Sequence, residues 1–245
     1  MNAGLQYIDG VLKLVELLKT EEQEQLSQAA QLIADAIEQG RTLHAFGTGH
    51  SHMLALELFY RAGGLASVNP ILEEGLMLHR NAVQSTDLER LEGLASVIFK
   101  QQSAKEGDVI IIASNSGRNA VNIEMALEAK ASGLKVIAIT SLKHAEASSS
   151  RHSSGKRLHE VSDVVIDNHG CIGDASVEIP GSPIRVAPTS TVSGALIMNA
   201  IVAEVVQLLV QRGVTPDLYA SSNMDAGDEH NRRLIDKYKG AIRSL

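Results

Sequence analysis

The hydrophobic positions of the chain form two alternating patterns, short continuous runs and longer stretches with helical spacing. The clearest run is 109–112, where Val109 and three isoleucines follow one another without polar alternation. Such a run is typical of a strand in a parallel sheet that is covered on both faces. Comparable runs predict strands at 42–46, at 66–68, at 164–166 and in the stretch that ends at Thr140. Their alternation with helices predicts an α/β fold, a flavodoxin-like doubly wound sheet of five parallel strands.

Helical spacing dominates the stretches between the predicted strands and both ends of the chain. Residues 4–19 place their aliphatic side chains on one stripe, and Thr20 with Gln23 can form the capping box of a second helix that reaches Ile37. Within the core, helices are predicted at 53–61, at about 87–102, after Asn119 and at 194–210. We expect one domain over 1–245, with an N-terminal helical hairpin at 1–40, an α/β core at 41–212 and a C-terminal extension with a charged helix at 213–245.

A polar turn separates the strand at 109–112 from the helix that follows it. It reads Ser114-Asn115-Ser116-Gly117-Arg118-Asn119. A helix N-terminus exposes unpaired N–H groups and a partial positive charge, so small polar side chains placed there supply further donors for a phosphate ester. Ser116 or Asn119 could instead serve only as an N-cap. Because several small polar residues follow one another, which is more than one cap requires, we favour a ligand site.

This turn resembles that of the SIS, or sugar isomerase, domain family of phosphosugar-binding proteins. The family's turn reads Ser-x-Ser-Gly-x-Ser or close to it, and Asn119 stands here in place of the last serine. The resemblance extends over about residues 43–210, and the general layout is similar to the phosphoheptose isomerase and muramic acid phosphate etherase branches. It implies a sugar-phosphate ligand. The protein would then be an isomerase or lyase acting on a sugar phosphate or amino-sugar phosphate, or a non-catalytic sensor of the same ligand.

Two further polar helix starts are predicted to take part in the same site. The first reads Gly47-Thr48-Gly49-His50-Ser51, where two glycines let the backbone approach a ligand closely. The other precedes the apolar helix at 194–210 and is rich in hydroxyls. We expect the phosphate to be held by Ser51, Ser114, Ser116 and Asn119. The predicted binding set is completed by Gly47, Thr48, Gly49, His50, Gly117 and, as secondary contributors, Asn115, Thr189, Ser190, Thr191 and Ser193.

Sugar isomerisation needs a base and an acid, typically Glu and His, within hydrogen-bond reach of the substrate. In the phosphoheptose isomerase branch the acidic residue lies late on the helix after the first turn, where this chain has Arg61; Glu57 lies one turn earlier on the same face. The histidine of that branch lies on the last helix of the sheet domain, where this chain has Met198 and Asn199. The C-terminal His230 is the substitute, with a capping role as its alternative. The predicted catalytic residues are Glu57 and His230, with Glu73 and His79 in reserve.

Composition narrows the choice of ligand and compartment. A net charge of −7 and an aromatic content of 3% argue against nucleic acid, because basic charge and stacking rings are both scarce. The nine histidines include no i, i+4 pair on a plausible helix, so neither a metal nor a cofactor is expected. A single cysteine, Cys171, and no apolar run approaching about 20 residues predict a reduced, cytoplasmic protein without a membrane span.

Three expectations concern surfaces and role. The N-terminal hairpin and the helix at 194–210 are too apolar to stay exposed, which predicts a homodimer. The Ser-rich basic stretch 143–160 could cover an anion, but its composition favours a mobile surface loop. An enzyme is favoured over a sensor, because no basic helix-turn-helix pattern is present to supply an output domain.

Overall fold

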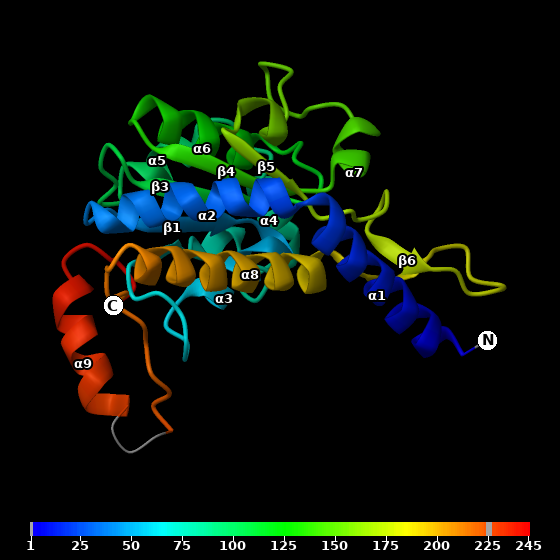
Figure 1. The fold of residues 1–245 in the computed structure, drawn as a ribbon. Helices are drawn as coiled ribbons and strands as arrows, with labels where there is room; N and C mark the ends of the chain where they lie inside the picture. The colour runs from blue at the N-terminus through cyan, green and yellow to red at the C-terminus, as the bar shows by residue number, and fades with distance from the viewer. Residues whose placement is uncertain (1, 224–226) are drawn as a thin grey trace.

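A parallel sheet of five strands forms the centre of the computed structural model, which describes residues 2–223 and 227–245 (Figure 1). The strands lie in the order β2-β1-β3-β4-β5, and every neighbouring pair is parallel. This is the flavodoxin-like order, so the predicted fold class is confirmed. The strands are β1 (Leu43–Gly47), β2 (Val68–Ile71), β3 (Val109–Ala113), β4 (Lys135–Thr140) and β5 (Val164–Asp167).

Helices cover both faces of the sheet. Along β3, Ile111 belongs to a hydrophobic cluster with α2 (Gln23–Glu38), α3 (His52–Leu58) and α8 (Ser190–Gln211), whereas Ile110 and Ile112 belong to a second cluster with α5 (Leu94–Phe99) and α6 (Ala120–Ala131). Successive side chains of a strand point to opposite faces. A strand buried on both faces therefore needs apolar residues at every position, and each residue of β3 is buried.

The second strand begins later than predicted, at Val68 instead of residue 66. Leu65 forms an antiparallel bridge with Leu218, and the backbone N–H of Ala66 donates to the carbonyl of Asp217 (2.8 Å). The first apolar residues of this run are therefore paired with the C-terminal extension before β2 starts. Pro70 is tolerated because β2 is an edge strand, where one row of N–H groups has no sheet partner.

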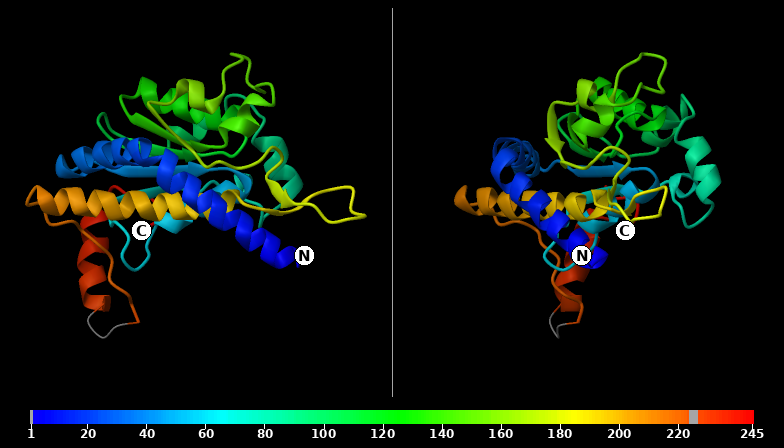
Figure 2. Two further views of the ribbon diagram at one scale, coloured as in Figure 1. Left: turned by 45° about the vertical axis from the view of Figure 1, so that its right-hand side comes forward. Right: turned by 90° about the vertical axis from the view of Figure 1, so that its right-hand side faces the viewer.

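The N-terminal helices α1 (Ala3–Glu21) and α2 are both present, joined by the single residue Glu22. Glu22 is buried, accepts from the backbone N–H of Asp167 (3.1 Å) and contacts His169 Nε2 at 3.0 Å. The predicted capping box is absent, because Thr20 Oγ1 donates to Glu16 O and Gln23 Nε2 donates to Lys19 O. With so short a joint the helices meet at an open angle and do not fold back on each other, so α1 leads away from the sheet (Figure 2).

The stretch predicted as one helix at 87–102 forms two short helices, α4 (Ala82–Leu88) and α5. Gly93 stands between them with φ +85°, a left-handed conformation that favours glycine. Residues 89–92 therefore form a connection at this point, not a helical turn.

The chain between β4 and α8 is more ordered than the sequence predicted. It holds α7 (Leu142–Glu146), a 3₁₀ turn at Leu158–Val161, and a two-stranded antiparallel hairpin of β6 (Ala175–Val177) and β7 (Val186–Pro188). The hairpin lies beside α1, where the Tyr7 hydroxyl donates to the carbonyl of Pro188 (2.9 Å). In Figure 1 both elements extend from the same end of the sheet.

Helix α8 corrects the expectation about apolar runs. By length and composition this helix, 22 residues long, could cross a membrane. Its buried side chains, among them Ile197, Ile201 and Val205, instead pack in the cluster shared with α2 and α3, as those of a core helix do.

The last helix, α9 (Gly227–Tyr238), lies at the amino edge of the sheet. Leu234 packs with Ala66 and Tyr219 in a small hydrophobic cluster, and the 217–219 segment is paired with the residues that lead into β2. The C-terminal extension is therefore tied to the end of the sheet where the strands begin.

A buried polar group fixes this same end of the sheet. His44 and Asp108 have side-chain exposures of 0% and 2%, and His44 Nε2 lies 3.1 Å from Asp108 Oδ2. Asn69 Nδ2 donates to His44 Nδ1, so Nε2 carries the hydrogen that Asp108 accepts. Asp108 also accepts from the backbone N–H groups of Thr42 (2.9 Å) and Lys105 (2.8 Å). Burial opposes ionisation of Asp108, but these hydrogen bonds outweigh it, and the net effect lowers the pKa of that carboxyl.

We expect Asp108→Ala to lower the free energy of unfolding by about 3–5 kcal/mol at pH 7, because it leaves buried donors without an acceptor. A carboxyl with a lowered folded-state pKa contributes stability above its unfolded pKa of about 4 and loses it as the pH falls further. Urea unfolding should therefore give a constant gap between parent and variant from neutral pH down to roughly pH 5, and a narrowing gap below about pH 4.

The matched control is Asp236→Ala on α9, an exposed carboxylate paired with Lys239, which should change stability by less than about 0.5 kcal/mol. Equal stability of Asp108→Ala and the parent at pH 7 would contradict the assignment.

Candidate functional site

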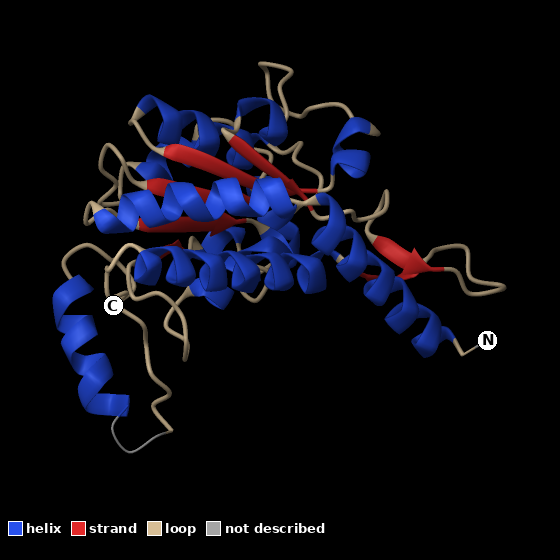
Figure 3. Ribbon diagram, in the orientation of Figure 1, coloured by secondary structure: helices blue, strands red, loops and turns tan. Residues whose placement is uncertain are grey.

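Two polar turns meet at the carboxyl edge of the sheet. In the register of β1 and β3, Gly47 pairs with Ala113, so Thr48 and Ser114 begin their turns side by side. The strand order reverses between β1 and β3, since β2 lies on the other side of β1. Ligands of doubly wound sheets bind in the crevice at such a switch point. Figure 3 shows the parallel strands running toward this common edge.

The first turn is a tight one that depends on glycine. A Cβ on Gly47 would lie 2.5 Å from the carbonyl oxygen of Ser51, and Gly49 has φ +56°. The chain therefore curls back closely through a 3₁₀ turn at Gly49–Ser51 before α3 begins. Ser51 stands at the N-cap position of α3 and makes no side-chain cap hydrogen bond.

The second turn has the same character. Ser114 is buried, and its Oγ accepts from the backbone N–H of Gly117 (3.3 Å), which holds the turn closed. Gly117 has φ +59°, and a Cβ there would meet Thr140 Oγ1 at 3.1 Å. Asn119 occupies the N-cap position of α6 but makes no side-chain cap hydrogen bond. A simple capping role therefore does not account for either Ser51 or Asn119.

Side chains from three elements connect the two turns. The Thr48 hydroxyl donates to Glu89 Oε2 (2.9 Å), and Asn122 Nδ2 donates to Thr48 Oγ1 (3.1 Å). Asn122 is fully buried one turn into α6, and Glu89 follows α4 directly. Sequence reasoning missed both residues, because Glu89 was assigned to the interior of a helix and Asn122 lay among apolar positions. Gly93, which breaks the predicted helix four residues after Glu89, was the signal that could have found Glu89.

The Ser-rich stretch lies against the second turn, which corrects the expectation of a mobile surface loop. The backbone N–H of Leu158 donates to the carbonyl of Gly117 (2.8 Å). The backbone N–H of Arg151 donates to the carbonyl of Arg118 (2.8 Å). The Arg151 side chain also donates from Nη1 to Asn119 Oδ1 (2.9 Å). Backbone hydrogen bonds of this kind give the loop a fixed position on the turn.

Positive charge gathers beside the second turn. Burial, and then the like charges of Arg118 and Arg90, lower the pKa of the Arg151 guanidinium, while Glu89 opposes them. Arg118 Nε is buried and has no hydrogen-bond partner among the described residues. Three guanidinium groups within electrostatic reach of one another favour an anion at this place.

The third polar helix start is satisfied within the chain. The Asp174 carboxylate accepts from the backbone N–H groups of Thr189 (3.0 Å) and Ser190 (2.9 Å) and from the Ser190 hydroxyl (2.5 Å). Ser193 Oγ donates to the carbonyls of Thr189 and Ser190. Because Asp174 already fills the anion position at the start of α8, the structure does not offer these groups to a phosphate. Thr191 lies in the first turn of the same helix.

Comparison with known proteins decides the family. The model of the SIS domain family matches residues 6–141, which is more than half of the chain. The chain belongs to the SIS domain family. A UPF0309 protein of Thermoanaerobacter pseudethanolicus is 46% identical over 245 residues, covering 98% of this chain and 99% of the relative.

Solved structures share the fold at low sequence identity. A phosphoheptose isomerase from Francisella tularensis superposes with a TM-score of 0.57 at 16% identity, covering 82% of this chain and 95% of that chain. The Vibrio vulnificus NanR protein complexed with ManNAc-6P gives a TM-score of 0.51 at 16% identity, covering 96% of this chain and 68% of that chain. At these identities the likeness concerns the SIS fold alone.

The positions at which the phosphoheptose isomerase branch has its acid and histidine lie together in this SIS domain. Glu57 on α3 forms an ion pair with Arg61 and accepts from Asn199 Nδ2 on α8 (2.7 Å). The predicted base Glu57 is therefore occupied by two neighbours. His230 lies elsewhere: its Nε2 contacts the carbonyl of Leu218 (2.8 Å), at the amino edge of the sheet. Within one copy of the chain, the structure does not bring Glu57 and His230 together.

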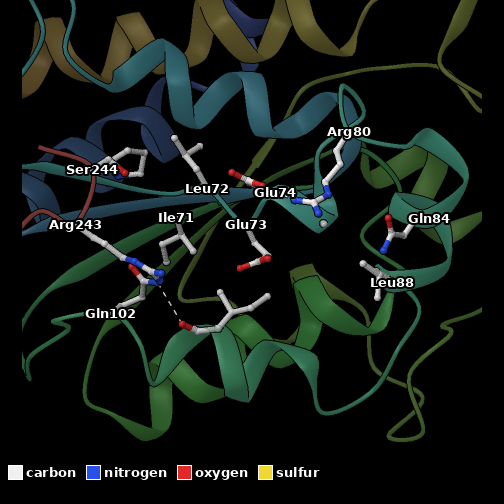
Figure 4. Close-up of a pocket in the computed structure, with 13 residues that line it drawn as sticks. Ile71, Leu72, Glu73, Glu74, Arg80, Gln84, Leu88, Gln102, Arg243 and Ser244 are labelled. Carbon is white, nitrogen blue, oxygen red and sulfur yellow. Dashed lines mark hydrogen bonds and ion pairs between the residues drawn. The ribbon is translucent and has the colours of Figure 1, made fainter.

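The two reserve residues lie near the carboxyl edge but in different surroundings. The ring of His79 lies 6.2 Å, between centroids, from that of His52, whose Nδ1 is close to the carbonyl of Gly49 in the first turn. Glu73 points into a cavity of about 540 Å³ at the free edge of β2, with Gln102 and Arg243 on its other side (Figure 4). Neither ligand turn lines this cavity.

Proposed function

We propose that the protein binds a sugar phosphate or amino-sugar phosphate at the two turns and acts on it as an isomerase or lyase. The observation that carries the proposal is the pairing of two strand-end turns whose helix starts are not capped by Ser51 or Asn119. The hydroxyls of Ser51 and Ser116 make no hydrogen bond to another described residue, so they are available to a phosphate group at the two turns.

Local charge supports the same ligand. The chain carries a net charge of −7, yet Arg90, Arg118 and Arg151 gather at the second turn. Hydrogen bonds to a charged group contribute about 1.5–3 kcal/mol each, so a phosphate ester would gain more here than a neutral sugar. The loop that carries Arg151 would then cover the phosphate end of the ligand.

For acid–base chemistry, we propose Glu89, a carboxylate that contacts the first turn directly. It accepts from Thr48, and Asn122 holds Thr48 in place, so its position is fixed relative to the ligand turns. Of the two histidines predicted as catalytic, His79 is the one that lies beside the first turn, next to His52. Glu57 and Glu73 keep a place as alternatives, and His230 would require a partner copy to bring it to the site.

A sensor of the same ligand is the second candidate function. It is favoured by the likeness to the NanR protein complexed with ManNAc-6P, because that likeness extends over 96% of this chain. The fold is thus found in proteins with a sugar phosphate bound as well as in isomerases, and turnover has to separate the two roles.

We further propose that the protein is a cytoplasmic homodimer. The exposed residues of α1 include Leu5 (57% exposed), Ile8 (53%) and Leu12 (60%), which lie on one stripe of the helix. Ile184 and Val186 of the neighbouring hairpin are also exposed. No described residue covers this apolar surface, and a second copy of the chain is the commonest partner for such a face. The free Cys171 suits a reducing compartment.

The ligand proposal predicts that Ser114→Ala combined with Ser116→Ala weakens sugar-phosphate binding by more than about a hundredfold, since two hydrogen bonds to a charged group contribute roughly 3 kcal/mol or more. Isothermal titration calorimetry with a panel of sugar phosphates measures the loss. Because Ser114 also closes the turn, Ser116→Ala alone separates ligand contact from turn structure. Ser182→Ala on the β6–β7 hairpin is the matched control, and unchanged affinity in the folded double variant would refute the proposal.

The acid–base proposal predicts that Glu89→Gln lowers turnover by about 10²–10⁴ while leaving affinity nearly unchanged, because an amide keeps the hydrogen bond to Thr48 but cannot transfer the proton. Glu57→Gln should have a much smaller effect, as that carboxylate is held by Arg61 and Asn199. If Glu57→Gln lowered turnover more than Glu89→Gln did, the acid–base role would belong to Glu57. Tight binding without turnover of any sugar phosphate by the parent protein would favour the sensor.

The dimer proposal predicts twice the monomer mass by light scattering at micromolar concentration, and a monomer for Leu5→Glu combined with Leu12→Glu, because burying charge in an apolar interface is costly. Val83→Glu is the control, since Val83 is 73% exposed on α4, away from this surface. A monomer mass for the parent protein in the same light-scattering measurement would contradict the proposal.

A further inference from the structure

A histidine and two glutamates converge where the Ser-rich loop meets the connection before α5 and the first half of α6. Glu92, Glu124 and His152 each present one potential ligand atom, and these atoms all lie within 4.8 Å of one another. His152 Nε2 is 3.6 Å from Glu124 Oε1, and the two side chains are only 10% and 15% exposed. The burial of His152 and Glu124 distinguishes this group from a chance cluster of exposed acidic residues.

Each of these side chains is held in place by a hydrogen bond to a neighbour. Glu124 accepts from the backbone N–H of Gly93 (2.8 Å), and Glu92 accepts from the N–H (2.6 Å) and hydroxyl (2.8 Å) of Ser153. His152 Nδ1 lies 2.7 Å from Ser154 Oγ. The backbone N–H of Ser154 also donates to His152 Nδ1 (3.3 Å), so the ring is oriented with Nε2 toward Glu124. A cation bound at Nε2 would displace the hydrogen that this nitrogen carries while Nδ1 accepts.

The charge of the group calls for a cation. The group brings two carboxylates close together beside one imidazole, and like charges at such separations repel each other. An imidazole with two carboxylates suits Zn²⁺ better than Ca²⁺ or Mg²⁺, which prefer shells made only of oxygen.

The geometry is close to what zinc requires. Zinc–ligand bonds of about 2.0–2.2 Å place tetrahedral ligand atoms roughly 3.4 Å apart. The His152–Glu124 pair already has this spacing, at 3.6 Å. Glu92 is exposed and follows α4 in the connection to α5, so its side chain can close the remaining gap.

We propose that Glu92, Glu124 and His152 form a structural Zn²⁺ site, with solvent as the fourth ligand, that fastens the Ser-rich loop beside the second turn. The site goes beyond the proposed function and does not depend on it. Arg151 precedes His152 and bonds Asn119, so a cation held by His152 would fix the residue that covers the second turn. Zinc would then add a further tie to the backbone hydrogen bonds that already hold the loop on the turn, and the loop would open less often with zinc bound.

Calorimetric titration of chelator-treated, tag-free protein with ZnCl₂ tests the proposal. The parent should bind one equivalent, and MgCl₂ and CaCl₂ should give no comparable binding. His152→Ala and Glu124→Gln should each weaken zinc binding by at least about a hundredfold, since even the partners of metal ligands are worth 10–100-fold. His159→Ala, a histidine of the same stretch outside the group, should bind zinc like the parent.

Limited proteolysis provides a readout that does not depend on affinity. Zinc should slow cleavage within 148–157 in the parent and in His159→Ala, and should have no effect in His152→Ala, with thermal melts confirming that every variant is folded. Absence of zinc binding by the parent would overturn the proposal, and so would binding that survives in His152→Ala combined with Glu124→Gln.

Discussion

The register between β1 and β3 is the constraint on which the rest of the site depends. Parallel pairing of Gly47 with Ala113 fixes where both strands end, so the two turns start from the same level of the sheet. A shift of one residue would turn every side chain of a strand to the opposite face, and would exchange Ile111 with Ile110 and Ile112 between two closely packed clusters. The apolar residues of β3 thus hold the ligand turns in place, although none of them belongs to the site.

Local patterns explain what the sequence predicted well. The isoleucine run of β3 and the polar turn after it are encoded by adjacent residues, and both lie where they were expected. The contacts that complete the site join distant segments: Glu89 reaches Thr48 over 41 residues, and Arg151 reaches Asn119 over 32. Such contacts depend on how elements pack, and periodicity within one segment carries no information about them.

Competing hydrogen bonds explain several of the errors. The capping box at Thr20 did not form because a hydroxyl inside a helix can bond the carbonyl four residues earlier, as Thr20 does with Glu16. The hydroxyls at the start of α8 resembled a ligand turn, but Asp174 from the preceding stretch accepts from that helix start. In both places the residue types suit the predicted role. The groups concerned instead form hydrogen bonds with another residue of the chain, Glu16 in the first case and Asp174 in the second.

The contacts of Glu57 show that this chain can have the SIS fold without a free carboxylate at that position. Glu57 on α3 contacts both Arg61, three residues beyond the end of that helix, and Asn199 on α8. A guanidinium and an amide in those positions have no proton to exchange near neutral pH. A carboxylate held by both of them would have to give up two partners before it could serve a substrate. Glu89, by contrast, accepts a hydrogen bond from Thr48, which belongs to the first ligand turn. If this chain performs acid–base chemistry on its ligand, the structure therefore favours a group on the α4 side of the turns over the α3–α8 contact.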